Sequence, residues 1–220
     1  TEYVTNNLRI DSNLNMQNQM VILSTPLNNV YTNSLIKTFL WQALPNATSY
    51  IFEIDTSNII VDTKIITQAS ITYTFPVQGT YSWHVRGQNS TSTSLSSSPR
   101  TILVDTTKPP VPVAISPLSS TITTATNPII FKWNVPAPTS RFDSTYYCQL
   151  QISTDPTFSV IDSTGKDTSI FVIANPMTYN FYSKPANLIS GTTYYWQVRT
   201  IDRAGNKSPY FTPTFSIKRD

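Results

Sequence analysis

One strand pattern occurs twice in the 220-residue chain and decides what the chain can fold into. The sequence GTYSWHVR runs from Gly79 to Arg86, and GTTYYWQVR runs from Gly191 to Arg199. In both copies Tyr, Trp and Val are two residues apart, so an extended strand places all three on one face. Each copy predicts a strand that is half buried in a two-layered β-fold, and the recurrence predicts a tandem repeat.

The composition fits compact β-domains and argues against several classes of partner. Apolar residues make up 39% of the chain and charged residues 12%, with a formal net charge of +3. Lys and Arg are scattered without a basic run, so we expect no nucleic-acid partner. The single cysteine argues against disulfide staples. Because no apolar run reaches the roughly 18 residues of a membrane helix and residues 1–10 lack a secretory signal, we expect a soluble chain.

Changes in pattern along the chain predict the domain boundaries. Residues 1–19 are polar and Asn-rich, and we interpret them as a leader or an added edge strand. Residues 20–106 form the first predicted domain. The segment 107–112 contains three prolines, which cannot donate to a sheet ladder, so it is predicted to be a short and stiff linker. Residues 113–220 form the second predicted domain, with longer loops.

The second domain repeats the first with two insertions. Equivalent positions are separated by 92, then 98, then 113 residues: Trp41 and Trp133, Ile54 and Ile152, Trp83 and Trp196. The growing separation places extra residues in Val135–Thr145 and in Thr164–Ser190. Because binding residues concentrate on loops held by a rigid scaffold, we expect these two segments to carry the functional surface.

The end of the second domain resembles a fibronectin type III domain. The residues that match the tyrosine corner of that family are Leu188, Gly191, Thr192 and Tyr194. Trp133, and Trp41 in the first domain, match the tryptophan of the family's strand B. The order FxW, YxxxI, YxWxVR, over about residues 20–220, is similar to modules of Bacteroidetes cell-surface lipoproteins. The resemblance implies an all-β chain of two tandem fibronectin-III/Ig-like β-sandwich domains joined by a short Pro-rich linker.

Two turns near the repeated strand are explained by folding alone. A buried tyrosine needs a partner for its hydroxyl, which the backbone turn before the strand can provide. In DRAGN, Gly205 permits the positive φ of a tight turn, while Asp202 and Asn206 can bond neighbouring amides. Domain one departs from the family pattern, because it has no leucine matching Leu188 and no AGN turn in residues 87–98.

Few residues offer catalytic or metal-binding chemistry. His84 is the single histidine, and we interpret it as an exposed strand side chain. Cys148 falls on an inward-facing position and is predicted to be a buried, inert thiol. Asp105 and Asp202 resemble calcium ligands between extracellular modules, but calcium takes about six to eight oxygens, so turn capping is favoured. We therefore predict no catalytic site, no metal and no cofactor.

The sequence predicts a non-enzymatic protein outside the cytoplasm that acts in adhesion, ligand binding or spacing. The alternative is a carbohydrate-binding or accessory module of a glycan-utilisation system, and a hydrolase has little support. We select Tyr179, Phe181 and Tyr182 as candidate ligand-binding residues, because their spacing is too irregular for every ring to face inward. The competing interpretation of this stretch is an extra strand pair that covers a sheet edge.

The expected partner is a protein or a glycan at a bacterial cell surface or outer membrane. A low charge content, loops rich in Ser, Thr and Asn, and a single cysteine are typical of exported bacterial surface proteins. We expect a monomer that is anchored through a segment outside this sequence, with a lipid as the candidate anchor.

Overall fold

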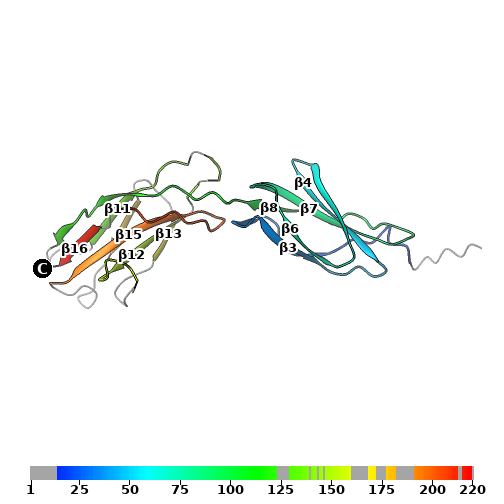
Figure 1. Ribbon diagram of the computed structural model, residues 1–220, viewed down its shortest axis with the longest axis horizontal. Helices are drawn as coiled ribbons and strands as arrows, with labels where there is room; N and C mark the ends of the chain where they lie inside the picture. Colours follow the sequence, from blue (N-terminus) through cyan, green and yellow to red (C-terminus); the bar gives the residue numbers. More distant parts are fainter. Residues whose placement is uncertain are drawn as a thin grey trace, which may run out of the picture. The chain divides into compact units, whose positions relative to one another are not determined.

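The computed structural model describes residues 14–122, 129–138, 140–142, 144–145, 147–159, 168–171, 177–181, 191–212 and 215–219. The chain divides into two compact units, unit 1 (Thr1–Asp105) and unit 2 (Thr106–Asp220). The described residues form sixteen β-strands and no α-helix (Figure 1). The all-β class predicted from the sequence is confirmed.

Unit 1 consists of two sheets. The smaller sheet has the order β1-β3-β6, with β1 at Leu23–Thr25, β3 at Ile36–Trp41 and β6 at Ser70–Thr74. The larger has the order β2-β8-β7-β4-β5, with β2 at Val30–Thr32, β8 at Arg100–Val104, β7 at Gly79–Gln88, β4 at Ser49–Thr56 and β5 at Ile59–Ile66. Neighbouring strands are antiparallel except β2 and β8, which are parallel.

Unit 2 has the same two sheets. The smaller sheet has the order β9-β11-β14, with β9 at Val113–Ser116, β11 at Ile129–Asn134 and β14 at Met177–Phe181. The larger has the order β10-β16-β15-β12-β13, with β10 at Ser120–Ile122, β16 at Phe215–Arg219, β15 at Thr193–Ile201, β12 at Tyr147–Ser153 and β13 at Thr168–Phe171. Strands β9 to β16 thus repeat β1 to β8 one for one, including the parallel pair β10 and β16.

Aromatic side chains fill the core of each unit. The four tryptophans at equivalent positions of the two units are at most 5% exposed: Trp41, Trp83, Trp133 and Trp196. In unit 1 the Phe39 ring lies 4.8 Å from the Trp83 ring, measured between centroids. In unit 2 the Trp196 ring lies 5.0 Å from that of Phe131. Because a large aromatic side chain buries about 150 to 250 Å², these rings supply much of the apolar area that each unit hides.

A tyrosine corner is present in unit 1, where the departure from the family pattern was expected. The Tyr81 hydroxyl donates a hydrogen bond of 2.8 Å to the carbonyl of Val77. Phe75 occupies the position that matches Leu188, and its ring centroid lies 4.6 Å from that of Tyr81. A Cβ added to Gly79 would lie 3.3 Å from the Tyr81 ring, so the turn keeps this residue small. The missing leucine therefore changes the packing partner and not the hydrogen bond.

The DRAGN turn of unit 2 forms as its sequence predicts. The Asp202 carboxylate accepts hydrogen bonds from the backbone N–H of Asn206 at 2.9 Å and from its side-chain amide at 2.8 Å. Gly205 has a φ of 91°. Asp202 is 3% exposed, so the turn satisfies a buried carboxylate.

The described end of segment 1–19 packs on unit 1. Met16 is fully buried, and its backbone N–H donates to the Ser92 hydroxyl at 2.9 Å. The backbone N–H of Leu95 donates to the carbonyl of Gln19 at 2.9 Å. Residues 14–19 therefore hold the Ser/Thr-rich loop that follows β7.

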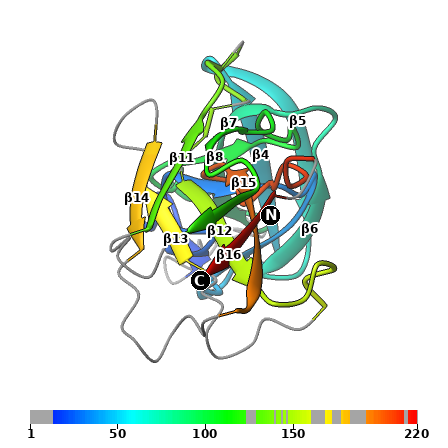
Figure 2. The same cartoon turned by 90° about the vertical axis from the view of Figure 1, so that its left-hand side faces the viewer.

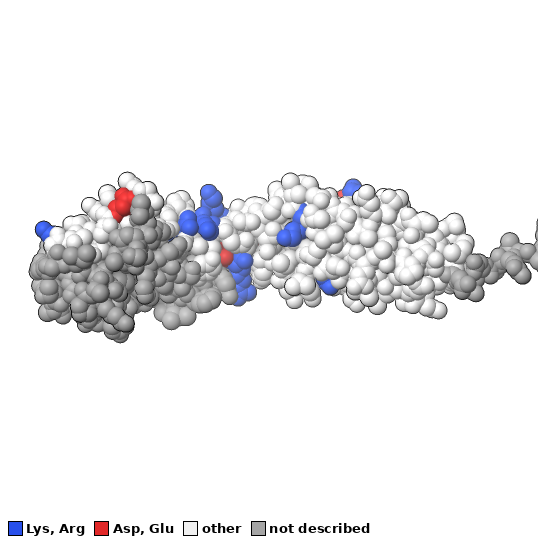
Figure 3. Space-filling view, turned by 90° about the horizontal axis from the view of Figure 1, so that it is seen from below, with Lys and Arg blue, Asp and Glu red and all other residues white. Residues whose placement is uncertain are grey.

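Charged side chains are sparse on the described part of one face of the molecule. On the face drawn in Figure 3, Lys, Arg, Asp and Glu are few against the other residues. The described residues contain no helix of the length and apolar character needed to cross a membrane.

Candidate functional site

The outer face of the larger sheet in unit 1 carries a cluster of charged side chains. Alternation along β4 and β7 directs Phe52 and Trp83 into the core, and their neighbours therefore face outward. Glu53 lies directly opposite His84 across the two strands. Asp55 and Arg86 lie two residues further along the same face, so four ionisable groups meet there.

Hydrogen bonds and ion-pair contacts connect the four groups of this cluster. His84 Nε2 lies 2.9 Å from Glu53 Oε2, and His84 Nδ1 lies 3.0 Å from Asp55 Oδ2. Arg86 Nη2 donates to both oxygens of Glu53, at 3.0 and 2.9 Å. A carboxylate only accepts, so His84 donates in both contacts when each ring nitrogen carries a proton.

His84 is not the exposed strand side chain that we expected. Its side chain is 18% exposed, and those of Glu53 and Asp55 are 6% and 11% exposed. The expectation was wrong because it treated the histidine as isolated, whereas the pairing of β4 with β7 places a carboxylate at each ring nitrogen. The visible signal was the pair Glu53 and Asp55, spaced to share one face of a strand.

The cluster is a charge network in which His84 and Arg86 contact the two carboxylates, while Arg86 Nε has no hydrogen-bond partner among the described residues. Glu53 accepts from both His84 and Arg86, which neutralises its buried charge. Within the described residues, no group of three or more His, Cys, Asp or Glu side chains has a geometry that could hold a metal ion. The contacts fix the register of β4 against β7, since a slip of one residue would turn these charges toward the core.

Unit 2 replaces this charge network with amides at equivalent positions. Gln151 stands where unit 1 has Glu53, Gln197 where it has His84, and Arg199 where it has Arg86. The Gln197 side-chain amide donates to Gln151 Oε1 at 2.7 Å. Arg199 Nε donates to Gln149 Oε1 at 2.6 Å. The same scaffold thus presents a charged outer face in one unit and a largely neutral one in the other.

Tyrosine side chains lie on the same outer face of unit 2. The Arg199 guanidinium lies over the Tyr210 ring, 4.7 Å from its centroid. The Tyr210 hydroxyl is 3.5 Å from Gln149 Oε1. Tyr147 and Tyr195 alternate with the glutamines along β12 and β15, and all three tyrosines are half-buried. We call this surface the amide–tyrosine face; its residues are Tyr147, Gln149, Gln151, Tyr195, Gln197, Arg199 and Tyr210.

The candidate ligand-binding residues Tyr179 and Phe181 lie in β14. In the ladder with β11, Tyr179 is opposite Phe131, and Phe181 is opposite Ile129. Figure 2 shows β14 beside β11. The side chains of Tyr179 and Phe181 are not described, and Tyr182 lies outside the described residues. Their role in binding a ligand stays a prediction.

Cys148 lies in the core of unit 2. It is fully buried, and its sulfur accepts a hydrogen bond of 3.3 Å from Trp133 Nε1. Burial raises the pKa of the thiol to about 11, against a smaller lowering by the tryptophan N–H. The prediction of a buried thiol is confirmed, and at neutral pH the sulfur stays protonated and unreactive.

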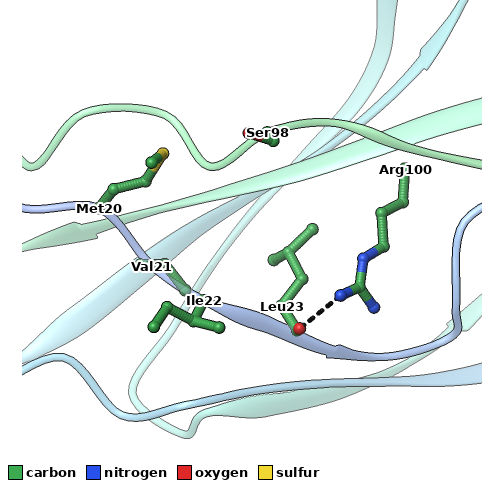
Figure 4. Close-up of a pocket in the computed structure, with 6 residues that line it drawn as sticks. All are labelled: Met20, Val21, Ile22, Leu23, Ser98 and Arg100. Atoms are coloured by element: carbon green, nitrogen blue, oxygen red, sulfur yellow. Dashed lines mark hydrogen bonds between the residues drawn. The ribbon is translucent and has the colours of Figure 1, made fainter.

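A hollow of ≈ 240 Å³ on unit 1 is lined by Met20, Val21, Ile22, Leu23, Ser98 and Arg100 (Figure 4). Arg100 donates to the carbonyls of Leu23, at 2.6 Å, Ser24, at 2.9 Å, and Pro26, at 2.7 Å. These bonds connect β8 of the larger sheet to β1 of the smaller one. Because the carbonyls already hold the guanidinium, the hollow is an apolar surface feature and not an anion site.

Comparison of the sequence with protein-family models and with curated proteins finds no match. Solved structures do match. The fibronectin(III)-like modules of Clostridium thermocellum CbhA align with a TM-score of 0.59 and 12% identity, over 91% of this chain and 95% of theirs. The FN1–FN3 domains of chicken CNTN1 align with a TM-score of 0.54 and 13% identity, over 90% of this chain and 67% of theirs.

These likenesses define the fold of the chain. Together with the repeated sheet order, they identify two tandem β-sandwiches of the fibronectin-III/Ig-like kind, as the sequence predicted. At this level of identity the comparison shows architecture only, so the function has to be argued from the surface.

Proposed function

We propose that the chain is a non-enzymatic binding module that acts outside the cytoplasm, in adhesion, in ligand binding or as a spacer within a larger protein. Two sandwiches with aromatic cores supply rigid supports, and their outer faces differ while their cores correspond. We further propose that it acts at a bacterial cell surface or outer membrane, held through a segment outside this sequence.

The amide–tyrosine face of unit 2 carries this proposal. Gln151 and Gln197 hold each other at 2.7 Å, and Gln149 holds Arg199 at 2.6 Å, so the planar groups are fixed before any ligand arrives. A preorganised surface loses little conformational entropy on binding. The half-exposed ring of Tyr210 adds apolar area with a polar tip, which suits recognition of a partner that is partly polar.

A carbohydrate ligand is the second candidate, and the same face favours it. Sugars combine apolar ring faces with many hydroxyls. Tyrosine rings can cover the first, and amides and a guanidinium can donate to and accept from the second. The equivalent face of unit 1 carries buried charges that bond to one another, so we place a sugar on unit 2.

The test is a glycan-array screen run beside a binding assay on whole bacterial and host cells, both with the full chain. Tyr195→Ala and Tyr210→Ala, made in folded protein, are expected to weaken whichever ligand is found by about tenfold or more each. Lys132→Ala is the matched control, because Lys132 is exposed on the smaller sheet of unit 2. Unchanged affinity in both tyrosine variants would remove the amide–tyrosine face from the proposal.

The segment with Tyr179, Phe181 and Tyr182 is a separate proposed ligand site. Each would be changed to Ala in the same assays, with circular dichroism and thermal melting to confirm that the sandwich stays folded. Loss of binding in these variants, with normal binding in the Tyr195 and Tyr210 variants, would place the ligand on the segment. Normal binding in all three would exclude it.

A further inference from the structure

Strand β5 forms an exposed, apolar edge of the larger sheet in unit 1. It spans Ile59–Ile66 and, among the described residues, pairs only with β4. Four of its apolar side chains are 46% to 68% exposed: Ile59, Ile60, Val61 and Ile65. Its second edge therefore offers backbone N–H and C=O groups, on alternate residues, to another strand.

An edge of this kind is costly to leave in water. Edge strands in monomeric proteins are usually short, charged or covered, because an exposed apolar edge pairs with other chains. β5 is eight residues long, whereas β2 at the other side of the sheet has three. Its charged side chains are Asp62 and Lys64, which form an ion pair of 3.1 Å.

The sequence of β5 is complementary to itself when two copies run antiparallel. A twofold axis between two such strands is perpendicular to the sheet, so residues on one face pair with residues on the same face. An axis through Asp62 would place two aspartates opposite each other, and an axis through Lys64 would place two lysines opposite each other. An axis through Thr63 places each Asp62 opposite a Lys64, and each Val61 opposite an Ile65.

A bulge limits the length of this ladder. Ile54 pairs with Asp62 and Asp55 pairs with Ile60, so Val61 is the extra residue of β5. On the N-terminal side of Val61 the alternation of side chains between the two faces shifts by one residue. Ile60 therefore lies on the opposite face from Ile66, its partner in a second copy, and same-face pairing ends there. The ladder therefore covers Val61–Ile65. In it the exposed side chains of Val61 and Ile65 of each copy pack against those of Ile65 and Val61 of the other.

We propose that β5 is a self-association edge: two copies of the chain pair their β5 strands antiparallel about Thr63 and join two five-stranded sheets into one. The paired charges select this register, because the neighbouring same-face registers place like charges opposite each other. This inference replaces the monomer expected from the sequence. It is independent of the ligand proposed for unit 2.

The test measures the mass of the full chain by sedimentation equilibrium over a concentration series from about 1 to 500 μM. Asp62→Lys and Lys64→Asp each place like charges opposite one another in the dimer, and each is expected to raise the dimer Kd by about tenfold or more. An equimolar mixture of the two variants restores opposite charges across the axis and is expected to dimerise. The double variant Asp62→Lys/Lys64→Asp is expected to dimerise as well.

The controls separate this edge from other surfaces and from misfolding. Lys132→Asp makes the same charge change on unit 2 and is expected to leave the Kd unchanged. Hydrogen exchange of the unaltered chain supplies a readout without substitution, in which amides in Val61–Ile65 gain protection as concentration rises. A wild-type chain that stays monomeric and gains no protection there overturns the proposal, as does a dimer that neither single variant weakens. Single variants that the mixture fails to rescue overturn the register.

Discussion

Removing His84 tests whether the charge network of unit 1 stabilises the fold. The substitution His84→Ala deletes the donors at 2.9 Å from Glu53 and 3.0 Å from Asp55. The two carboxylates then remain almost buried on the same strand face, and Arg86 reaches only Glu53. We expect unit 1 to be destabilised, although the substituted residue lies outside the aromatic core.

The size of the effect follows from the contacts. A hydrogen bond to a charged group contributes about 1.5 to 3 kcal/mol, and breaking a buried ion pair costs about 3 to 5 kcal/mol. Water can enter beside a side chain that is already 18% exposed, which lowers the cost. We expect a loss of about 3 kcal/mol in the free energy of unfolding, or roughly 12 to 20 °C in Tm for a unit of this size.

The repeat supplies a matched control. Gln197→Ala removes the equivalent residue of unit 2, which makes one neutral hydrogen bond to Gln151. Its expected cost is about 1 kcal/mol. Urea unfolding of the full chain would be followed by tryptophan fluorescence for both units and by labelling of Cys148 for unit 2 alone, since Cys148 is buried there. His84→Ala should shift the fluorescence midpoint and leave the labelling midpoint in place.

A transplant of the unit 2 residues tests the reasoning in the opposite direction. Glu53→Gln, Asp55→Ser and His84→Gln together give unit 1 the residues of the equivalent positions in unit 2. Without carboxylates to leave unpaired, the triple variant should be more stable than His84→Ala. Two results would refute this account of the network. One is a His84→Ala variant whose free energy of unfolding falls by less than about 1 kcal/mol. The other is a triple variant that is less stable than His84→Ala.

Three further outcomes are expected. Trp196→Phe should lower the free energy of unfolding by about 1 kcal/mol more than Trp83→Phe, measured by denaturant titration. The reason is that Trp196 Nε1 donates to the Pro117 carbonyl at 3.0 Å, whereas Trp83 Nε1 has no partner among the described residues. Cys148 should resist thiol reagents at pH 8 in the native chain and react on unfolding, because burial raises its pKa to about 11. Burial raises the pKa of Asp62, but hydrogen bonds from Lys64 and Tyr73 outweigh it, and the pKa is lowered from 3.8. The carboxylate therefore stabilises unit 1 above about pH 4, and this contribution is lost at lower pH. Asp62→Asn should abolish this acid dependence in thermal melts from pH 7 to pH 3.

The features that alternation controls could be predicted from the sequence. Residues two apart share a strand face, so the tryptophans and the inward position of Cys148 followed directly. The sheet order also repeats in unit 2 as the equivalent positions indicated. Strand β5 was missed, because its sequence IIVDTKII does not alternate and gives no inward face. Position at a sheet edge depends on the whole topology, which local patterns do not encode.

The site was harder to predict because it depends on register between strands. Glu53 and His84 are 31 residues apart in sequence and become neighbours only when β4 pairs with β7. A sequence pattern specifies which face each residue takes but not which residue stands opposite it. The histidine therefore looked isolated, and the sequence analysis assigned no role to Glu53 or Asp55.

The two outer faces differ for a reason that bears on function. Packing constrains the inward residues of both units to the same tyrosine, tryptophan and valine pattern, since a change of even one methylene is felt in a close-packed core. The outward residues are constrained only by one another, so Glu53 with His84 and Gln151 with Gln197 are alternative solutions at equivalent positions. A buried charge network stabilises β4 against β7 and directs its carboxylates to His84 and Arg86 of the same cluster. An amide network holds its side chains with weaker hydrogen bonds but at lower desolvation cost, and this is why unit 2 is the better place to look for a ligand.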